Sequence, residues 1–201
     1  MSEDWDEFAT HWEEDEQPRI FRDQAFSSLM AHGVLGADAR TRARVLDFGC
    51  GTGLLSEKLS PLVKEIIAVD TSPEMLGRLK AKAIANVTAL CADLDDPATR
   101  ADAAWLGSLD LIVASSVCGF LPDYEKTVRT LSAALRPGGY FVQWDWLAAD
   151  GDAEYGLPQA RIENALHGAG LEDVTVRQVF SVTFDGEALP VLMGAGRAPS
   201  R

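Results

Sequence analysis

The chain has 201 residues, 47% of them hydrophobic, which suits a single globular domain over residues 1–201 with a well-buried core. Its formal net charge of −13 argues against nucleic acid or an anionic membrane as the main partner, because either would require a cationic surface. No apolar run approaches the roughly 20 residues that span a bilayer, and three widely spaced cysteines predict reduced thiols, so we expect a cytoplasmic protein.

The N-terminal segment, residues 1–33, is expected to be helical and to form a cap or lid on the rest of the domain. Helices are predicted over 4–14 and 18–32, the second ending by Gly33. Three aromatic side chains of the first helix recur at spacings of three and four and would share one face: Trp5, Phe8 and Trp12.

The remaining core, residues 43–201, alternates short apolar runs with amphipathic segments. Strands are predicted at 43–48, 66–70, 87–91, 110–115, 140–146, 174–183 and 190–196. Helices are predicted at 53–59, 73–84, 123–136 and 158–169. This alternation predicts an α/β fold of the doubly wound type, with a mostly parallel sheet, helices on both faces and the final strand at or near an edge. Ligands of such sheets bind beyond the carboxyl ends of the strands.

The most informative stretch is Val45–Gly53, where an apolar strand breaks at Asp47 and three glycines then alternate with small residues. Glycine adopts backbone conformations that other residues avoid, so a ligand can approach the bare main chain. The helix start that follows would also present unpaired N–H groups to that ligand. We therefore expect a ligand-binding turn between the first strand and the next helix.

Two further acids follow the next two strands, and together they describe a nucleoside pocket. Asp70 lies about 20 residues beyond the glycine turn, where a carboxylate can accept hydrogen bonds from both ribose hydroxyls. Asp93 is placed to accept a hydrogen bond from an adenine amino group, and Met75 to pack on a purine face. The spacing G-x-G-x-G differs from the G-x-G-x-x-G of dinucleotide sites, so we do not expect a pyrophosphate there.

These motifs resemble those of the class I S-adenosylmethionine-dependent methyltransferases, in particular the branch that acts on small molecules. The similar segments follow the family's order over about residues 43–147: Val45–Gly53, Ile67–Leu76, Ala92–Leu94, Asp110–Ser116 and Leu135–Gly139. The resemblance implies a Rossmann-like sheet of seven strands with the last one antiparallel. It also implies S-adenosylmethionine as cofactor and S-adenosylhomocysteine as product.

Carried over to this sequence, the resemblance implies a set of cofactor-binding residues. The glycines would approach the methionine part and the ribose, Asp47 the methionine amino group, Asp70 the ribose, Asp93 the adenine and Ser115 the region beside the sulfonium. The full set is Asp47, Gly49, Cys50, Gly51, Gly53, Asp70, Thr71, Met75, Asp93, Leu94 and Ser115. The stretch Trp5–Glu13 is also similar to the short aromatic segment that opens many relatives, with Trp12 in place of the usual tyrosine.

The sequence says less about the site for the methyl acceptor than about the cofactor site. Candidates for contact with the substrate or for a lid are Trp12, His11, Cys118, Trp144 and Trp146, each of which also suits ordinary packing or a solvated position. Trp144 and Trp146 would share one strand face. The histidines have no metal-ligand spacing, so no metal site is predicted, and no residue is identified as catalytic.

We therefore predict a methyltransferase that acts on a small molecule by in-line displacement, as a monomer or a homodimer. Methyltransferases that act on amino groups of bases or glutamine carry an Asn-Pro-Pro-Tyr-type sequence after the fourth strand. This chain has Ser115–Cys118 there, which argues against such a substrate. The acceptor atom, whether O, N or C, remains open. Two alternatives are a nicotinamide-dependent oxidoreductase on a related fold and a non-catalytic module that binds the cofactor or another protein.

Overall fold

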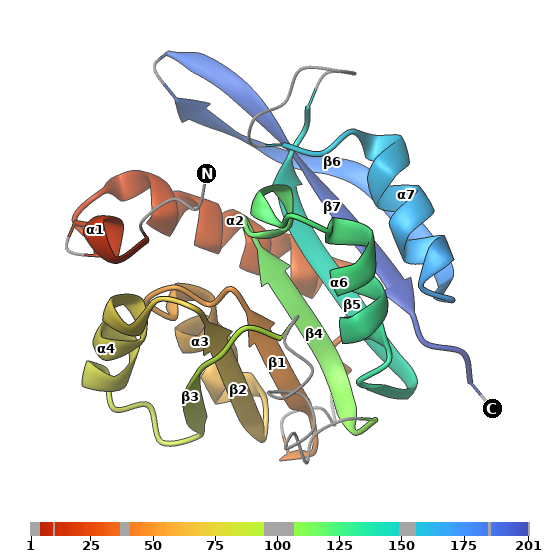
Figure 1. Ribbon diagram of the computed structural model, residues 1–201, viewed down its shortest axis with the longest axis horizontal. Coiled ribbons are helices and arrows are strands. Elements are labelled where there is room, and N and C mark those ends of the chain that lie inside the picture. Colours follow the sequence, from red (N-terminus) through yellow and green to blue (C-terminus); the bar gives the residue numbers. More distant parts are fainter. Residues whose placement is uncertain are drawn as a thin grey trace.

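Seven strands form one sheet in the order β3-β2-β1-β4-β5-β7-β6 (Figure 1). The computed structural model describes residues 5–9, 11–36, 41–94, 107–148, 156–184 and 186–200. The strands are β1 (Arg44–Phe48), β2 (Glu65–Asp70), β3 (Val87–Cys91), β4 (Leu109–Ser115), β5 (Leu135–Trp146), β6 (Glu172–Phe184) and β7 (Glu187–Arg197). Neighbours among β1 to β5 pair in parallel, whereas β7 is antiparallel to both β5 and β6. The predicted fold class and the antiparallel last strand are confirmed, and β7 lies one strand in from the edge.

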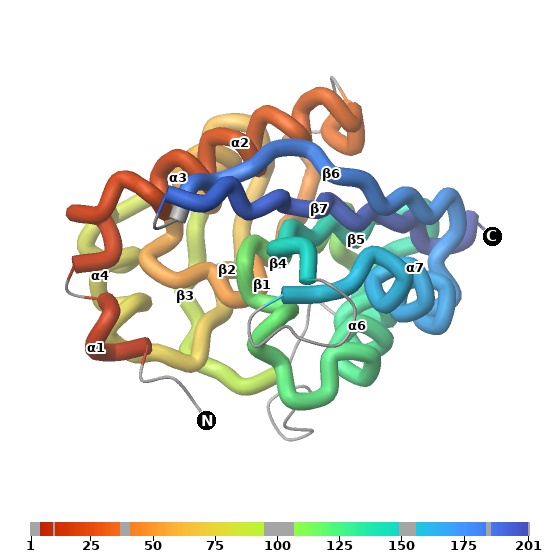
Figure 2. Tube along the Cα trace, turned by 90° about the horizontal axis from the view of Figure 1, so that it is seen from above, coloured from red at the N-terminus to blue at the C-terminus, as the bar shows by residue number. Residues whose placement is uncertain are grey.

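Helices cover both faces of this sheet. Their bounds are α1 (Trp5–Ala9), α2 (Glu16–His32), α3 (Leu54–Leu59), α4 (Pro73–Ala81), α6 (Tyr124–Ser132) and α7 (Gln159–Gly168), with short 3-10 turns η2 (Ser60–Leu62) and η3 (Cys118–Phe120). Figure 2 shows α2 and α3 on one face and α6 and α7 on the other. None of the helices within the described ranges is long and apolar enough to cross a bilayer.

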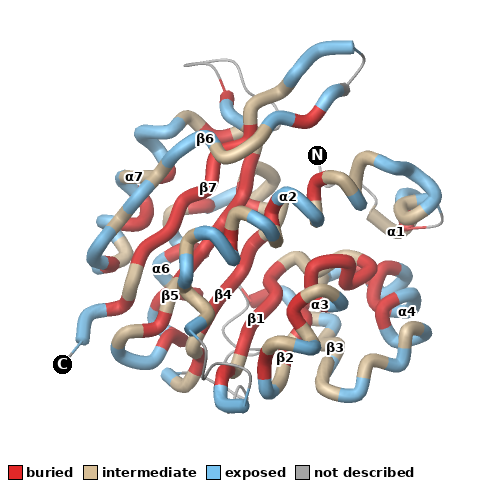
Figure 3. Tube along the Cα trace, turned by 180° about the vertical axis from the view of Figure 1, so that it is seen from behind, coloured by how far each residue is buried: buried red, intermediate tan, exposed pale blue. Residues whose placement is uncertain are grey.

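The core consists of two layers because alternate residues of each strand point to opposite faces. In β1, Val45 belongs to the buried cluster beneath α2 and α3, while Leu46 belongs to the cluster beneath α6 and α7. Both side chains have no exposed surface. Figure 3 shows the same buried character along the central strands, as expected for parallel strands covered on both sides.

The prediction of one helix over 4–14 is wrong. Helix α1 ends at Ala9, and a turn over 11–14 then leads into α2. Asp15 takes an extended conformation and its side chain accepts a hydrogen bond from the Gln17 N–H at 3.1 Å, so it caps a separate second helix. This cap also starts α2 two residues earlier than expected, at Glu16. The three aromatic side chains therefore do not share one helical face.

Two other helices end earlier than predicted. Helix α4 ends at Ala81, and the Asn86 side-chain amide donates to the carbonyl groups of Ser60 and Val63, which draws the chain back toward the sheet. Helix α6 ends at Ser132 because Leu135 already pairs with Leu109 in the sheet. In both cases tertiary contacts override the local helical pattern.

Candidate functional site

A cavity of about 970 Å³ opens at the carboxyl ends of β1, β2 and β4. Its walls come from the loops after these strands, from the start of α2, and from the end of β6. Predicted site residues that line it are Trp12, Asp47, Gly49, Cys50, Gly51, Asp70, Thr71, Met75, Asp93, Leu94, Ser115 and Trp146. The predicted residues outside its lining are His11, Gly53, Cys118 and Trp144. The structure thus brings the three strand-end acids into one cavity.

The glycine turn folds over the end of β2. The N–H groups of Gly49 and Cys50 both donate to the Val69 carbonyl, at 2.8 and 3.0 Å. Gly51 has φ +54°, and a Cβ added there would meet nothing closer than Met75 Sδ at 3.9 Å, so its main chain is open to the cavity. Gly53 serves a different purpose. At φ +78°, a Cβ would lie 2.2 Å from Leu79 Cδ1, so this glycine lets α3 and α4 pack together.

Asp70 holds the cofactor side of the cavity together. One carboxylate oxygen accepts the Gly51 N–H at 2.8 Å, and the other accepts the Ser72 N–H at 2.9 Å. Ser72 in turn caps α4 by accepting the Met75 N–H at 3.1 Å. A single side chain therefore fixes both the glycine turn and the start of the next helix, and it directs a carboxylate into the cavity between them.

Asp47 is a buried acid at the floor of the cavity, with 1% of its surface exposed. Burial raises its pKa to about 6, and the negative charge of Asp70 acts in the same direction. The Ser56 hydroxyl donates to its carboxylate at 2.6 Å, which opposes the rise. A ligand cation placed beside Asp47 would favour its charged form, so the site is suited to an ammonium or sulfonium group.

The two cysteines near the site are not activated thiols. Burial raises the pKa of both Cys50 and Cys118 above the usual value, and nearby carboxylates raise it further. Cys118 has 1% of its surface exposed and packs in the core behind the cavity wall. The prediction that Cys118 contacts the substrate therefore has no support in the geometry.

Aromatic side chains form the other half of the cavity. Trp5 contacts Trp12 and Phe120 in near-perpendicular geometry, with ring centroids 6.3 and 5.2 Å apart. Phe21 contacts Trp146 in the same manner at 6.5 Å. Within the described part of the chain, the buried Nε1 of Trp146 has no hydrogen-bond partner. This half is therefore apolar, with an indole N–H left to donate to a ligand.

Two predicted site residues, His11 and Trp144, lie outside the cavity. Trp144 is fully buried on the face that α2 covers, where its Nε1 donates to the Ser28 hydroxyl at 2.8 Å. The expected alternation holds, but the helix above this strand separates its two indoles. The His11 side chain is 76% exposed and pairs with Glu14 at 2.8 Å. Neither residue reaches the cavity.

A buried polar network supports the cavity wall, and no sequence pattern predicted it. The Tyr124 hydroxyl donates to Gln143 Oε1 at 2.7 Å, and Gln143 Nε2 donates to Asp145 at 2.8 Å. Asp145 also accepts the Gly119 N–H at 3.1 Å, which fixes η3, the turn that contributes Phe120 to the aromatic half. Burial raises the pKa of Asp145 to about 6. The network joins α6, β5 and η3, so only the folded chain assembles it.

The segment from α1 to the start of α2 is tied to both ends of α4. At the helix start, Asp6 accepts hydrogen bonds from the Ser72 hydroxyl and, at 3.4 Å, from the Glu74 N–H. At the helix end, Lys82 pairs with Glu13 at 2.8 Å. These contacts hold Trp5 and Trp12 over the cavity, and Figure 1 shows α1 beside α4.

Comparison with known proteins identifies similar sequences. A family model described as a methyltransferase domain matches residues 21–181. An uncharacterised methyltransferase of Schizosaccharomyces pombe is 30% identical over 118 residues, which cover 56% of this chain and 41% of the relative. A ubiquinone biosynthesis O-methyltransferase of Xanthomonas axonopodis pv. citri is 32% identical over 100 residues, covering 48% of this chain and 40% of the relative. The chain thus spans about two fifths of the length of these relatives.

Solved structures share the fold. The complex of DhpI with SAH superposes with a TM-score of 0.72 at 20% identity, covering 98% of this chain and 94% of that one. A putative methyltransferase in complex with the Haloferax volcanii Trm112 activator gives a TM-score of 0.72 at 18% identity, covering 99% of each chain. At these identities the likeness concerns the fold.

Proposed function

The chain belongs to the class I S-adenosylmethionine-dependent methyltransferases, and from this premise we propose that it transfers the methyl group of S-adenosylmethionine to a small-molecule acceptor. The observation that carries the proposal is Asp70, whose carboxylate is held by the Gly51 and Ser72 N–H groups at the mouth of a bare glycine turn. The ubiquinone O-methyltransferases among the relatives support a small-molecule acceptor.

The residues present fit an adenosyl cofactor with a methionine tail. Asp70 would accept hydrogen bonds from the ribose hydroxyls, and Asp93 from the adenine amino group. Met75 lies 3.9 Å from the Cβ position of Gly51 and offers a polarisable sulfur to a purine face. Asp47 would face the positive groups of the tail, where its burial makes a charge pairing strong. Apart from Gly53, the remaining expected contacts line the same cavity: Gly49, Cys50, Thr71, Leu94 and Ser115.

The protein's contribution to the reaction is alignment and exclusion of water, because the bound cofactor supplies a methyl group on a good leaving group. Gly51 and Asp70 would orient the donor, while Phe21, Phe120 and Trp146 would hold the acceptor in an apolar space. The buried Trp146 N–H would donate a hydrogen bond to an acceptor oxygen or nitrogen. The aromatic walls favour a flat acceptor.

Turnover is the direct test. With methyl-labelled S-adenosylmethionine and a panel of phenols, quinols, amines and β-keto compounds, we expect label in at least one acceptor. Calorimetry should show binding of S-adenosylhomocysteine and none of NADH. Tight NADH binding without S-adenosylhomocysteine binding would favour the oxidoreductase alternative. Cofactor binding without turnover across the panel would favour the non-catalytic alternative.

We also propose that residues 5–15 act as a lid, anchored by Asp6 at the start of α4. Asp6→Ala removes an acceptor from the Ser72 hydroxyl and the Glu74 N–H, so the lid should open more often. We expect S-adenosylhomocysteine to dissociate about five- to tenfold faster, the effect of losing roughly 1 kcal/mol of hydrogen bonding. Stopped-flow tryptophan fluorescence measures this rate, since Trp5 and Trp12 line the cavity. Glu7→Ala, on an exposed position of the same helix, is the control, and equal rates in the two variants would refute the lid.

Cofactor affinity should depend on pH through Asp47. Its pKa of about 6 in the folded protein means that part of the population is neutral below pH 6, whereas the cationic tail favours the ionised carboxylate. Affinity for S-adenosylhomocysteine should therefore rise between pH 5 and 7, by up to about tenfold per unit below pH 6, and then level off. Calorimetry across this range measures it. Asp47→Asn should flatten the profile while keeping an oxygen for Ser56, and an equally steep profile in that variant would assign the effect elsewhere.

The remaining proposals concern the cellular compartment, the class of partner and the oligomeric state. All three cysteines are free thiols, which supports a reducing compartment such as the cytoplasm. The net charge of −13 supports a partner other than nucleic acid or an anionic membrane. We propose a monomer or a homodimer, which light scattering distinguishes.

A further inference from the structure

A chain of three buried polar side chains lies behind the aromatic half of the cavity. Tyr124 of α6 and Gln143 of β5 have no exposed surface, and Asp145 of β5 has 3% exposed. The Tyr124 hydroxyl donates to Gln143 Oε1 at 2.7 Å, and Gln143 Nε2 donates to Asp145 Oδ2 at 2.8 Å. None of the three residues lines the cavity. Burial of polar groups costs free energy that apolar side chains of the same shape would avoid, so this chain calls for a role beyond filling the core.

The hydrogen bonds of the chain run in one direction and end on the Asp145 carboxylate. Burial raises the pKa of Asp145 to about 6, and hydrogen bonds from the Gly119 N–H, the Gln143 amide and Cys118 oppose this rise. Above that pH the carboxylate is mostly ionised and can only accept hydrogen bonds. Gln143 must therefore turn its amide nitrogen toward Asp145 and its oxygen toward Tyr124. The chain holds Asp145 Oδ2 in place and leaves Oδ1 for a different partner.

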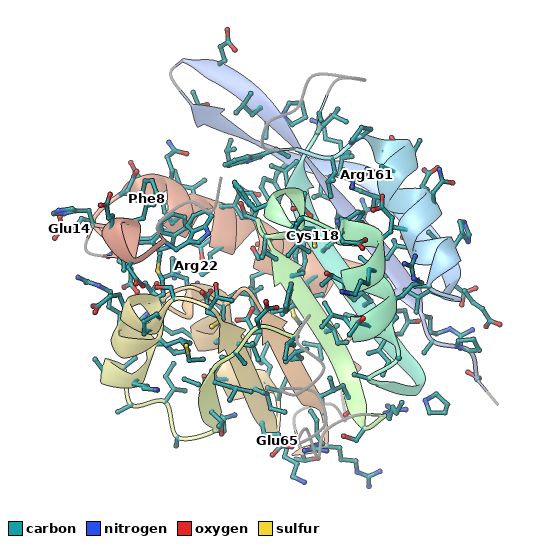
Figure 4. All side chains as sticks on the ribbon, in the orientation of Figure 1. Phe8, Glu14, Arg22, Glu65, Cys118 and Arg161 are labelled. Atoms are coloured by element: carbon teal, nitrogen blue, oxygen red, sulfur yellow. The ribbon has the colours of Figure 1, made fainter. Side chains whose placement is uncertain are left out.

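That partner is the backbone of η3. Asp145 Oδ1 accepts the Gly119 N–H at 3.1 Å, and η3 packs against β5. Figure 4 labels Cys118, the first residue of η3, beside α6, and Cys118 and Tyr124 belong to the same buried cluster. The side of η3 that faces the core is thus fixed by the Asp145 carboxylate.

The other side of η3 and its flanking residues form part of the cavity wall. The residues from this segment that line the cavity are Val117, Gly119, Phe120, Leu121 and Pro122. Phe120 also contacts Trp5 of α1, with ring centroids 5.2 Å apart. The end of β5 therefore places two parts of the aromatic half. Trp146 lines the cavity directly, whereas Asp145 points to the opposite face of the strand and acts on Phe120 through the Gly119 N–H.

We propose that Asp145 is a positioning residue for the methyl acceptor: its carboxylate fixes η3 so that Phe120 forms the wall against which the acceptor packs. The inference rests on the proposed function. Asp47 and Asp70, which the proposed function assigns to the cofactor, belong to β1 and β2, and β4 separates these strands from β5. Loss of the Asp145 carboxylate should therefore weaken the use of the acceptor and leave cofactor affinity in place.

The test replaces Asp145 with side chains of the same branched shape, at about pH 8, where its carboxylate is ionised. Asp145→Leu offers no acceptor to the Gly119 N–H, whereas Asp145→Asn keeps an oxygen for it. With the acceptor that the methyl-labelling panel identifies, Asp145→Leu should lower kcat/KM about 10- to 100-fold, the effect of leaving a buried donor unpaired. Most of the loss should appear in KM, since Phe120 would contact the acceptor before as well as during methyl transfer. Asp145→Asn should recover most of the loss, and calorimetry should give an affinity for S-adenosylhomocysteine within about twofold of wild type in both variants.

Two further variants test the route from Asp145 to the acceptor. Tyr124→Phe removes one buried hydrogen bond of the chain but leaves the Asp145 carboxylate and the Gly119 N–H paired, so it should lower stability and keep the acceptor kcat/KM. Phe120→Ala removes the proposed wall itself and should raise the acceptor KM by a similar factor. In this background Asp145→Leu should have little further effect. Phe120 is only partly buried, so its variant keeps the proposal testable even if Asp145→Leu does not fold.

The results separate this inference from the proposed function. If the wild-type protein methylates no acceptor in the panel, the proposed function fails, and the role of Asp145 fails with it. Turnover with an unchanged acceptor KM in Phe120→Ala would mean that Phe120 does not hold the acceptor, which overturns the proposal. The proposal is also overturned if Asp145→Leu weakens S-adenosylhomocysteine as much as the acceptor, or if Tyr124→Phe shows the same loss, because the network would then support the domain as a whole.

Discussion

Replacing Asp70 with alanine is expected to lower the affinity for S-adenosylhomocysteine at least about 100-fold, since two charge-assisted hydrogen bonds to the ribose are worth roughly 3 kcal/mol or more. The substitution would also release the Gly51 and Ser72 N–H groups, which the carboxylate accepts at 2.8 and 2.9 Å. The glycine turn would then be held on β2 only by the hydrogen bonds from Gly49 and Cys50 to the Val69 carbonyl. Calorimetric titration measures the change in Kd.

Asp110→Ala provides a matched control for this experiment. Asp110 also accepts a backbone N–H, that of Arg44 at 2.8 Å, but it lies at the opposite end of the sheet in β4. Its removal should lower stability without changing cofactor affinity. A loss of affinity of similar size in both variants would show that any weakening of the sheet reduces binding, and that Asp70 has no direct part in it.

Gly53→Ala is expected to lower the free energy of unfolding by about 2 to 4 kcal/mol. Two causes add: the φ of +78° strains any residue with a Cβ, and that Cβ would meet Leu79 Cδ1 at 2.2 Å. The added carbon would displace the Leu79 side chain, which belongs to the buried cluster beneath α3 and α4. Urea denaturation measures the loss.

Two further variants separate strain from overlap. Gly33→Ala has nearly the same φ, +79°, but nothing lies within 4 Å of the added Cβ, so strain alone should cost about 1 kcal/mol there. Truncating Leu79 to alanine in the Gly53→Ala background should relieve part of the clash and recover part of the lost stability, giving a favourable coupling in the double-mutant cycle. Equal losses at Gly33 and Gly53, with no coupling, would mean that the approach of the two helices is not what requires this glycine.

The aromatic half of the cavity shows that a side chain can be assigned to the correct strand face and still be wrongly placed at the cavity. The alternation of β5 predicts that Trp144 and Trp146 share a face, and both do lie on the side of the sheet covered by α2. Helix α2 crosses Trp144 and leaves only Trp146 at the cavity. Periodicity assigns a face, whereas the length and position of a helix from another part of the chain decide which residues on that face stay open.

Some helix bounds can also be predicted from nearby residues, whereas others depend on contacts with distant segments. The start of α4 at Pro73 and the stop of α2 by Gly33 were predicted from the chain because each uses hydrogen bonds within a few residues. The early ends of α4 and α6 depend on Asn86 and on the pairing of Leu135 with Leu109, which join segments distant in sequence. A sequence pattern carries no signal for such contacts.

By itself, the sequence predicted the α/β class, the glycine turn and the acids at the strand ends, because each depends on backbone conformation and on residues close together in the chain. Only the tertiary structure decided the contacts of Asp6 and Gly53. These contacts depend on what lies opposite each residue: the start of α4 for Asp6 and Leu79 for Gly53. Such contacts form when packing brings distant segments together, and the hydrophobic pattern that drives packing does not specify polar partners.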